Sequence, residues 1–398
     1  MIVYAENTIA YLIFTNTPLN SLLPKQNLRM QVMKEVLLKE LSKSDIDWII
    51  STGRRKEIAS GTILIQEKKA PDALHILLDG TLKVTVSQPE QNPLARAFAV
   101  MEDIETLDRE IARLSSGEVV GEIPFVGNRS TTTTVSAVEK SLVMSIPQQQ
   151  LAAKLQQDVG FAARFYRAIA IIFSDRLQGI INQLGRKNFG KSQPVRDVLC
   201  VLGELHDSDI DWLMAAGIPQ KVSANTVLIH QGGTVDALYI LLNGTMSLSI
   251  SEDERNPLAR AFAAIEGNEI SGREIGRLSK GEIIGETPFI DSRLPLANVR
   301  AIEDSLVLSI SRQKLAAKLQ QDMGFASRFY RAIATLLSHR LQGMYSQLGY
   351  GRQFYSRGLS LNDNLEYEDE LDLNVLDRIA LAGKRFNWIQ EQLTNYPV

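Results

Sequence analysis

The stretch GEVVGEIPF, residues 117–125, decides the fold of this chain, because it occurs again as GEIIGETPF at residues 281–289. The two copies lie 164 residues apart. The same shift places residues 150–170 on residues 314–334 without a gap, and 18 of these 21 residues are identical. A period of this length far exceeds the 20–50 residues of solenoid repeats. The chain is therefore predicted to contain one domain that has been duplicated.

The length of the chain allows two domains of ordinary size, because 398 residues leave about 150 for each copy after the end segments are set aside. We expect an N-terminal arm, two domains joined by a short linker, and an acidic tether that leads into an amphipathic C-terminal helix. The boundaries of these five parts are 1–28, 29–185, 186–193, 194–350 and 351–398.

Composition narrows the class of protein. The net charge is −3 and no basic block occurs, which disfavours a nucleic-acid partner. The single cysteine, Cys200, cannot form an internal disulfide, which favours a reducing compartment. The N-terminus lacks the pattern of a signal peptide, and its apolar run at residues 9–14 is too short to span a bilayer. These features predict a cytoplasmic protein without membrane insertion.

Each copy has a strand-rich middle followed by a long helix. Residues 81–86 alternate, so Leu82, Val84 and Val86 are expected to face inward and Thr85 outward. Further strands are expected at 62–65, 74–78, 134–138 and 142–146.

A long helix is expected over residues 151–184, with an apolar stripe at spacings of three and four. The stripe fits either a helix packed on its own core or one that pairs with a partner helix. The fold class is therefore mainly β with flanking helices, and each β-sandwich or jelly roll is followed by a long helix.

Residues 117–135 and 281–299, here called the first and second cassettes, resemble the phosphate-binding cassette of the cyclic-nucleotide-binding domain superfamily. That family includes the bacterial catabolite activator group and kinase regulatory subunits. The likeness extends over residues 30–185 and 194–348, and it implies two tandem jelly-roll-like β-rolls. No helix-turn-helix pattern follows the second long helix, which argues against a transcription factor.

The resemblance implies roles for two residues in each cassette. Gly121 and Gly285 stand where the family's cassette begins its short helix, and Glu122 and Glu286 stand where its glutamate accepts a hydrogen bond from the ribose 2′-hydroxyl. A cyclic nucleotide is thus the ligand that the family implies, and no other cofactor is expected.

The arginine that pairs with the phosphate in the family is replaced in both copies. It follows the glycine by ten positions, where this chain has Thr131 and Pro295. The nearest arginines, Arg129 and Arg293, come two positions earlier, which moves a side chain by about 6–7 Å along an extended segment. They act either as substitute phosphate ligands or as solvent-facing residues at a loop tip.

An insertion that typical family members lack occurs in both copies, at residues 92–99 and 256–263. Its helices either form a contact surface for a partner or cover their own β-roll. The partner-binding candidates in it are Leu94, Phe98, Leu258 and Phe262.

The C-terminal segment carries a helix with one apolar face after an acidic stretch. Such a helix on a polar tether either docks on a partner or packs back on the second domain. The partner-binding candidates on it are Leu376, Ile379, Phe386 and Trp388.

Catalytic signals are absent from the sequence. Residues 185–192 match the phosphate-loop pattern of nucleotide hydrolases, but a helix precedes them and Pro194 follows, where the mechanism needs a strand and a helix. The four histidines are scattered without ligand spacing, so no metal site is expected.

The sequence therefore predicts a non-enzymatic tandem protein that acts by protein–protein binding, as a scaffold or assembly component, with altered or lost nucleotide binding. The alternative is a cytosolic cyclic-nucleotide sensor that binds its ligand mainly in the second domain. A homo-oligomer is compatible with either.

Overall fold

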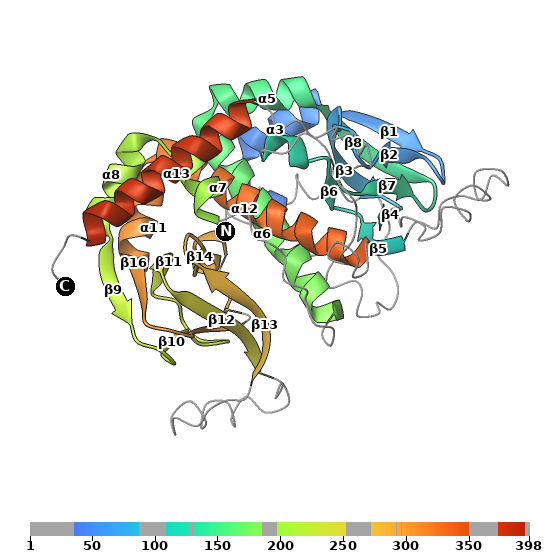
Figure 1. The fold of residues 1–398 in the computed structure, drawn as a ribbon. Helices are drawn as coiled ribbons and strands as arrows, with labels where there is room; N and C mark the ends of the chain where they lie inside the picture. Colours follow the sequence, from blue (N-terminus) through green and yellow to red (C-terminus); the bar gives the residue numbers. More distant parts are fainter. Residues whose placement is uncertain are drawn as a thin grey trace, which may run out of the picture. The chain divides into compact units, whose positions relative to one another are not determined.

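The computed structural model describes residues 36–86, 109–126, 131–184, 197–251, 272–291, 293–295, 297–349 and 373–394. The chain divides into two compact units between Gln157 and Asp158. Each unit contains one β-roll with helices beside it (Figure 1). The division places the long helix that follows the first roll in the second unit.

The first unit has two four-stranded antiparallel sheets, with strand orders β1-β8-β3-β6 and β2-β7-β4-β5. Residues 36–40 are helical and precede α3. The elements are α3 (Lys43–Thr52), β1 (Arg54–Ile58), β2 (Ile63–Ile65), β3 (Ala73–Asp79), β4 (Thr81–Val86), β5 (Arg109–Ser115), β6 (Val119–Val120), the 3-10 helix η1 (Ile123–Phe125), β7 (Thr134–Ala137), β8 (Ser141–Pro147) and α5 (Gln148–Gln157).

The second unit repeats this plan, with sheet orders β14-β11-β16-β9 and β10-β15-β12-β13, and adds helices from both copies and from the C-terminal segment. Its elements are α6 (Val159–Leu184), α7 (Asp197–Glu204), α8 (Asp207–Ala216), β9 (Ile218–Val222), β10 (Val227–Ile229), β11 (Ala237–Asn243), β12 (Thr245–Ser251), β13 (Gly272–Ser279), β14 (Ile283–Ile284), α10 (Thr287–Ile290), β15 (Asn298–Ala301), β16 (Ser305–Ser311), α11 (Arg312–Gln321), α12 (Met323–Gly349) and α13 (Leu373–Thr394).

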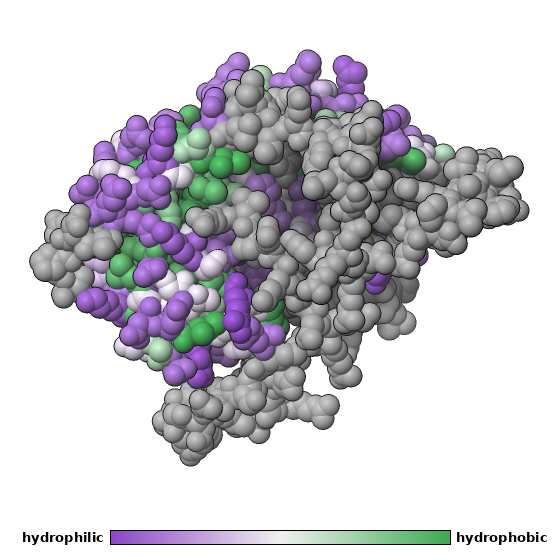
Figure 2. Space-filling model, viewed as in Figure 1, coloured by the Kyte–Doolittle hydropathy of each residue, from purple (hydrophilic) through white to green (hydrophobic). Residues whose placement is uncertain are grey.

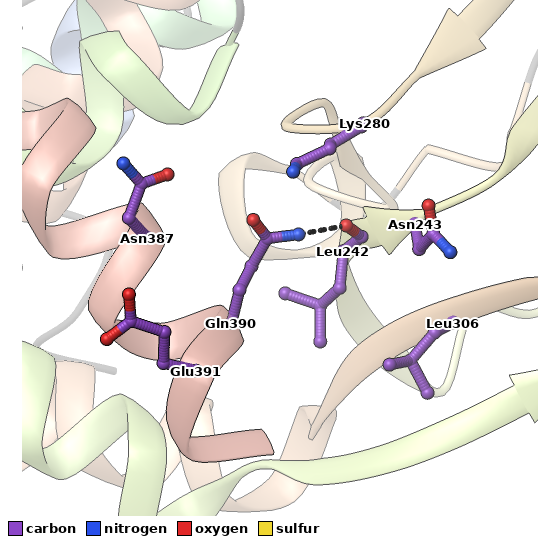
Figure 3. Close-up of a pocket in the computed structure, with 7 residues that line it drawn as sticks. All are labelled: Leu242, Asn243, Lys280, Leu306, Asn387, Gln390 and Glu391. Atoms are coloured by element: carbon purple, nitrogen blue, oxygen red, sulfur yellow. Dashed lines mark hydrogen bonds between the residues drawn. The ribbon is translucent and has the colours of Figure 1, made fainter. Parts of the chain in front are cut away.

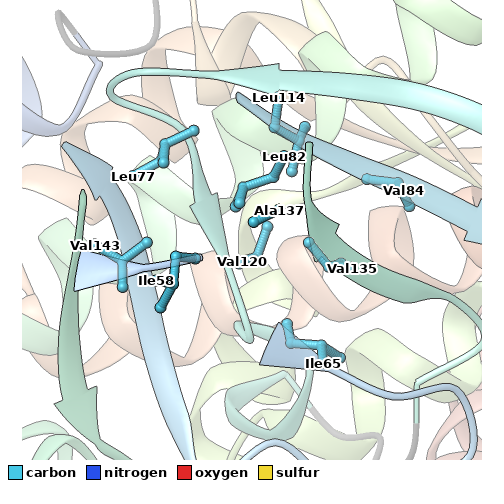
Figure 4. Close-up of a cluster of buried hydrophobic side chains, with 10 residues drawn as sticks. All are labelled: Ile58, Ile65, Leu77, Leu82, Val84, Leu114, Val120, Val135, Ala137 and Val143. Carbon is cyan, nitrogen blue, oxygen red and sulfur yellow. The ribbon is translucent and has the colours of Figure 1, made fainter. Parts of the chain in front are cut away.

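The two rolls bury the same positions. Ten side chains fill the core of the first roll (Figure 4), and the shift of 164 carries nine of them onto the buried core of the second. The exception is Val84, whose counterpart Leu248 is partly buried against that core. The first core consists of Ile58, Ile65, Leu77, Leu82, Val84, Leu114, Val120, Val135, Ala137 and Val143. The prediction of two jelly-roll-like domains is confirmed.

One local expectation was wrong, and the largely helical region expected at residues 151–184 consists of two helices. Thr85 is buried, and the pairing of β4 with β5 shifts register between Val84 and Thr85, which interrupts the strict in-out alternation there. The long helix is also not continuous from residue 151, since α5 ends at Gln157 and α6 begins at Val159. The carboxylate of Asp158 accepts a hydrogen bond from the backbone N–H of Phe161 (2.8 Å), so it caps the start of a new helix.

The apolar stripe of the first long helix is buried. Phe161, Phe165, Ile169, Ile172 and Phe173 are each at most 2% exposed, and α6 packs along α12, the equivalent helix of the second copy. The stripe was expected either to pack on its own core or to pair with a partner helix. Both hold, because the stripe is buried and its partner helix belongs to the same chain.

Reciprocal contacts join these two helices. The guanidinium of Arg167 lies 5.8 Å from the ring centre of Tyr330, and that of Arg331 lies 5.9 Å from the ring centre of Tyr166. The shift of 164 exchanges the two pairs. The two helices are therefore related by a local two-fold symmetry, which is possible because the duplication gave them equivalent residues.

Candidate functional site

The short helix of each cassette follows a Gly-Glu pair whose glycine has a positive φ, +86° at Gly121 and +81° at Gly285. A Cβ on Gly121 would lie 2.4 Å from the carbonyl oxygen of Ala73, and a Cβ on Gly285 would lie 2.7 Å from that of Ala237. Glycine is thus required here by backbone conformation and by the close approach of a strand. The fold alone explains these two residues, whether or not a ligand binds.

A second Gly-Glu pair, four positions earlier, closes the turn at the start of each cassette. The carboxylate of Glu118 accepts the backbone N–H of Ser115 at 2.5 Å, and that of Glu282 accepts the backbone N–H of Ser279. Glu282 is buried, with 4% of its surface exposed. Its burial together with the nearby charge of Asp197 raises its pKa to about 7.

In the second cassette Glu286, the residue expected to bind the ribose, is already bound by a side chain of the same chain. Glu286 precedes helix α10, and its carboxylate accepts a hydrogen bond from Arg340 Nη1 of α12 at 2.9 Å. Arg340 Nη2 donates to Asp197 Oδ2 (2.5 Å), and Asp197 also accepts the backbone N–H of Ile283 at 3.3 Å. One guanidinium therefore links the cassette, α7 and α12.

The protonation of this group follows from burial and charge. Burial alone would lower the pKa of Arg340, but the charges of Asp197 and Glu286 raise it, so the guanidinium stays charged. Burial raises the pKa of Asp197 in spite of its contact with Arg340. The cluster thus contains one fixed positive charge and, at Asp197, a carboxyl group that burial makes reluctant to ionise.

The candidate substitute for the phosphate-binding arginine in the second cassette, Arg293, also has partners within the chain. Its Nε donates to Asp291 Oδ2 at 2.6 Å, and its Nη1 donates to Asp175 of α6. Burial opposes the charge, but these two carboxylates raise the pKa of Arg293. Pro295 uses its carbonyl oxygen to accept the backbone N–H of Gly232 at 2.9 Å. Arg293 is therefore already neutralised by carboxylates of the same chain.

In the first cassette, Glu122 and Thr131 are buried, at 4% and 5% exposure. The hydroxyl of Thr131 lies 3.1 Å from the carbonyl oxygen of Gln66, to which it donates, and its own carbonyl accepts the backbone N–H of Lys68 at 2.7 Å. Thr131 thus fastens the turn between β2 and β3. Arg129 lies outside the described residues.

The C-terminal helix packs back on the second domain, which is one of the two alternatives expected for it. Residues Ala382, Phe386, Ile389 and Leu393 of α13 are buried, and α13 contacts α7. Arg385 donates to the carbonyl oxygens at the end of α7, namely Leu202 (2.5 Å) and Leu205 (2.8 Å).

Of the partner-binding candidates, Phe386 points into the domain, and Ile379 is half-buried. Trp388 and Leu381 remain 41% exposed on α13. On the face shown in Figure 2, polar side chains cover most of the described surface and apolar ones form separate patches. The four insertion residues and the side chain of Leu376 lie outside the described residues.

A cavity of about 510 Å³ lies between α13 and the end of the second roll (Figure 3). In it the side chain of Gln390 reaches from α13 to the carbonyl oxygen of Leu242, to which it donates. The lining contains no cassette residue; it is made of Leu242, Asn243, Lys280, Leu306, Asn387, Gln390 and Glu391.

The described residues contain no cluster of His, Cys, Asp and Glu that could hold a metal ion. None of the described helices is both long and apolar enough to cross a membrane. Cys200 lies 3.2 Å from His339 Nδ1, but burial and the carboxylates of Asp197 and Glu204 raise the thiol's pKa to about 12. Burial also lowers the pKa of His339, so this pair is neutral rather than a thiolate–imidazolium nucleophile.

Sequence reasoning missed Arg340, Asp197 and Asp175, because none lies within a cassette. Arg340 is 54 residues from Glu286, and Asp175 is 118 residues from Arg293. One signal was present: Arg340 has an equivalent, Arg176, on the other long helix, within a shared Arg-Leu-Gln-Gly run. An arginine repeated on a mostly apolar helix indicates a charged partner.

Comparison with known proteins gives a family match in both copies. The cyclic nucleotide-binding domain family matches residues 55–158 and 219–322, together just over half of the chain. A lysophospholipase, nte1, of Neosartorya fischeri is 22% identical over 306 residues, which cover 73% of this chain and 18% of that protein. The cGMP-dependent protein kinase egl-4 of Caenorhabditis briggsae is 22% identical over 317 residues, covering 79% of this chain and 34% of the kinase. The chain thus spans only a fifth to a third of the length of these relatives.

Solved structures with similarity include the regulatory domain of Toxoplasma gondii PKA with cAMP. It is 17% identical with a TM-score of 0.27, over 77% of this chain and 95% of that one. The catabolite activator protein of Thermus thermophilus is 14% identical with a TM-score of 0.30, over 48% of this chain and 75% of that one. The duplicated sequence, the paired rolls and the two family matches lead to one conclusion: this chain belongs to the cyclic nucleotide-binding domain family and carries two such domains in tandem.

Proposed function

We propose that this chain is a non-enzymatic scaffold or assembly component that works by binding other proteins, and that its second cassette does not take cyclic AMP or cyclic GMP under ordinary conditions. One observation supports the proposal above all: both charged groups that would serve a cyclic nucleotide there are engaged inside the chain. Glu286 is engaged by Arg340, and Arg293 by Asp291 and Asp175.

The energetic consequence is a competition within the protein. A ribose would have to displace Arg340 from Glu286, and a phosphate would have to displace Asp175 or Asp291 from Arg293. Each hydrogen bond to a charged group is worth about 1.5–3 kcal/mol. Two such losses weaken binding by about 3–6 kcal/mol, which corresponds to roughly two to four decades of affinity.

The nucleotide half of the proposal is tested by thermal unfolding with 5 mM cyclic AMP, cyclic GMP, adenosine or guanosine. A ligand present at about 100 times its dissociation constant adds about 2.7 kcal/mol of stability, or several degrees in Tm. We expect the Tm to change by less than about 1 °C with each compound.

The two nucleosides serve as controls in this experiment, because they carry the ribose without the phosphate that Arg293 would have to neutralise. A rise of several degrees with a cyclic nucleotide that disappears in Glu286→Ala would reject the proposal in favour of the cytosolic sensor.

The protein-binding half concerns the exposed side of α13. Leu381 and Trp388 are spaced by seven residues, hence lie on one side of the helix, and each is 41% exposed. We expect the double variant Leu381→Lys, Trp388→Lys to lose partners that the wild-type chain retains in affinity purification from its native cells, with an unchanged Tm.

The matched control is Ile218→Lys, which places the same charge on an apolar residue that is 62% exposed on strand β9. It should retain the partners. If the α13 double variant still recovers every partner, this side of the helix is not the contact.

A further inference from the structure

Three carboxyl groups surround one guanidinium where the second cassette meets α7 and α12. Asp197 and Glu286 bind Arg340 directly, and Glu282 is the residue before Ile283, whose carbonyl oxygen lies 3.3 Å from Arg340 Nη2. Asp197 and Glu282 are 3% and 4% exposed. With all three carboxylates ionised the group would carry a net charge of −2 away from water, which is unfavourable.

Glu282 can hold a proton that relieves this charge up to about neutral pH. Burial and the charge of Asp197 raise the pKa of Glu282 to about 7. The equivalent turn residue of the first roll is Glu118, and the position equivalent to Asp197 there is Met33. In the sequence, the second copy thus has an aspartate at a position where the first copy has a methionine.

Helix α7 connects this cluster to the C-terminal helix. Asp197 is its first residue, and its last residue, Glu204, accepts Arg378 Nη1 of α13 at 2.7 Å. Gly203 of α7 lies so close to α13 that a Cβ on it would be 3.3 Å from the carbonyl oxygen of Arg378. Lys280, two residues before Glu282, lies over the ring of Phe386 of α13 at 5.8 Å. The cluster is thus linked to α13 in two ways, through helix α7 and through the contact between Lys280 and Phe386.

We propose that Glu282, Asp197, Glu286 and Arg340 form a proton-linked clamp, which holds α7 and with it α13 on the second domain at mildly acidic pH and loosens them as the pH rises to neutrality. The charged groups that act on Glu282 are Asp197 on α7 and Arg340 on α12, and Arg340 in turn binds Glu286 before α10. His339 of α12 faces Cys200. The clamp belongs to the fold of the second domain and does not depend on the proposed function.

The direction of the pH effect follows from linkage. An unfolded or opened Glu282 releases its proton near its ordinary pKa of 4.5, whereas the closed clamp retains it up to about pH 7. Between these values the closed state binds more protons, so its advantage over the open state falls as the pH rises. Opening increases by up to tenfold per pH unit in this window and levels off above it.

The experiment is hydrogen exchange of residues 373–394 in the full chain at pH 5.5, 6.5, 7.5 and 8.5, expressed as protection factors so that the intrinsic pH dependence of exchange is removed. We expect protection of α13 to fall at least about tenfold between pH 5.5 and 7.5 and then to level off. In Glu282→Gln, which keeps the side chain neutral, the protection should not depend on pH.

The matched control is Glu118→Gln, the same change in the equivalent turn of the first roll, where α13 should behave as in the wild type. The clamp is rejected if wild-type protection of α13 is constant from pH 5.5 to 8.5, or if Glu282→Gln keeps the full pH dependence. Because the readout is α13 itself, these outcomes are independent of whether any nucleotide or partner protein binds.

Discussion

Replacing Arg340 by methionine is expected to lower the free energy of unfolding of the second domain by about 3–5 kcal/mol. The variant keeps most of the side-chain volume but removes the charge that Asp197 and Glu286 share. Their side chains are only 5% and 12% exposed, so water does not replace the lost partner. Two carboxylates left without a cation in such surroundings are strongly unfavourable.

The measurement is differential scanning calorimetry, which separates the transitions of the two compact units, together with urea unfolding followed by circular dichroism. The control is the triple variant Arg340→Met, Asp197→Asn, Glu286→Gln, which removes the guanidinium together with the two carboxylates that it binds. It should recover more than half of the loss, because replacing a whole buried ion cluster by neutral groups costs much less than breaking it. A loss below about 1 kcal/mol in the single variant would mean that this cluster is solvated rather than buried.

Replacing Gly285 by alanine is expected to destabilise the second domain by about 2–5 kcal/mol. The new Cβ would lie 2.7 Å from the carbonyl oxygen of Ala237, and the residue has a φ of +81°. The obstacle is backbone, which cannot rotate away as a side chain can. Gly121→Ala should act likewise on the first domain, where the distance to the oxygen of Ala73 is 2.4 Å.

Gly232→Ala is the matched control, since Gly232 has a φ of +71° but nothing within 4 Å of its added Cβ. Only the conformational cost should appear there, about 1–2 kcal/mol. Urea unfolding of the three variants measures the difference directly. Equal losses in Gly285→Ala and Gly232→Ala would contradict the close approach between the cassette and β11.

The fold was predictable because both copies have the same pattern of core residues and turn glycines. Alternating residues such as Leu82 and Met246 occupy equivalent core positions, and glycine stands wherever the cassette turns under a strand. What failed was local: the register between β4 and β5 shifts at Thr85, and a period-two pattern in the sequence does not report such an irregularity. The break at Asp158 also went undetected, because one capping carboxylate leaves the apolar stripe unchanged.

The docking of α13 on the second copy becomes understandable only from the contacts. Arg385 binds Asp207 at 2.6 Å, and Gly203 admits the backbone of α13. At the equivalent positions the first copy has Lys43 and Lys39. These differences are visible in the sequence, but nothing in it says that α13 meets those positions rather than others.

By itself, the amino-acid sequence determined the duplication, the β-roll fold and the cassette positions, because strand patterning, turn glycines and a repeat are local features. Only the tertiary structure decided that the charged residues of the second cassette are paired within the chain. Arg340 reaches Glu286, and Asp175 reaches Arg293, only after helices distant in sequence pack against the cassette. Charge pairing depends on distance in space, and no spacing along the chain encodes it.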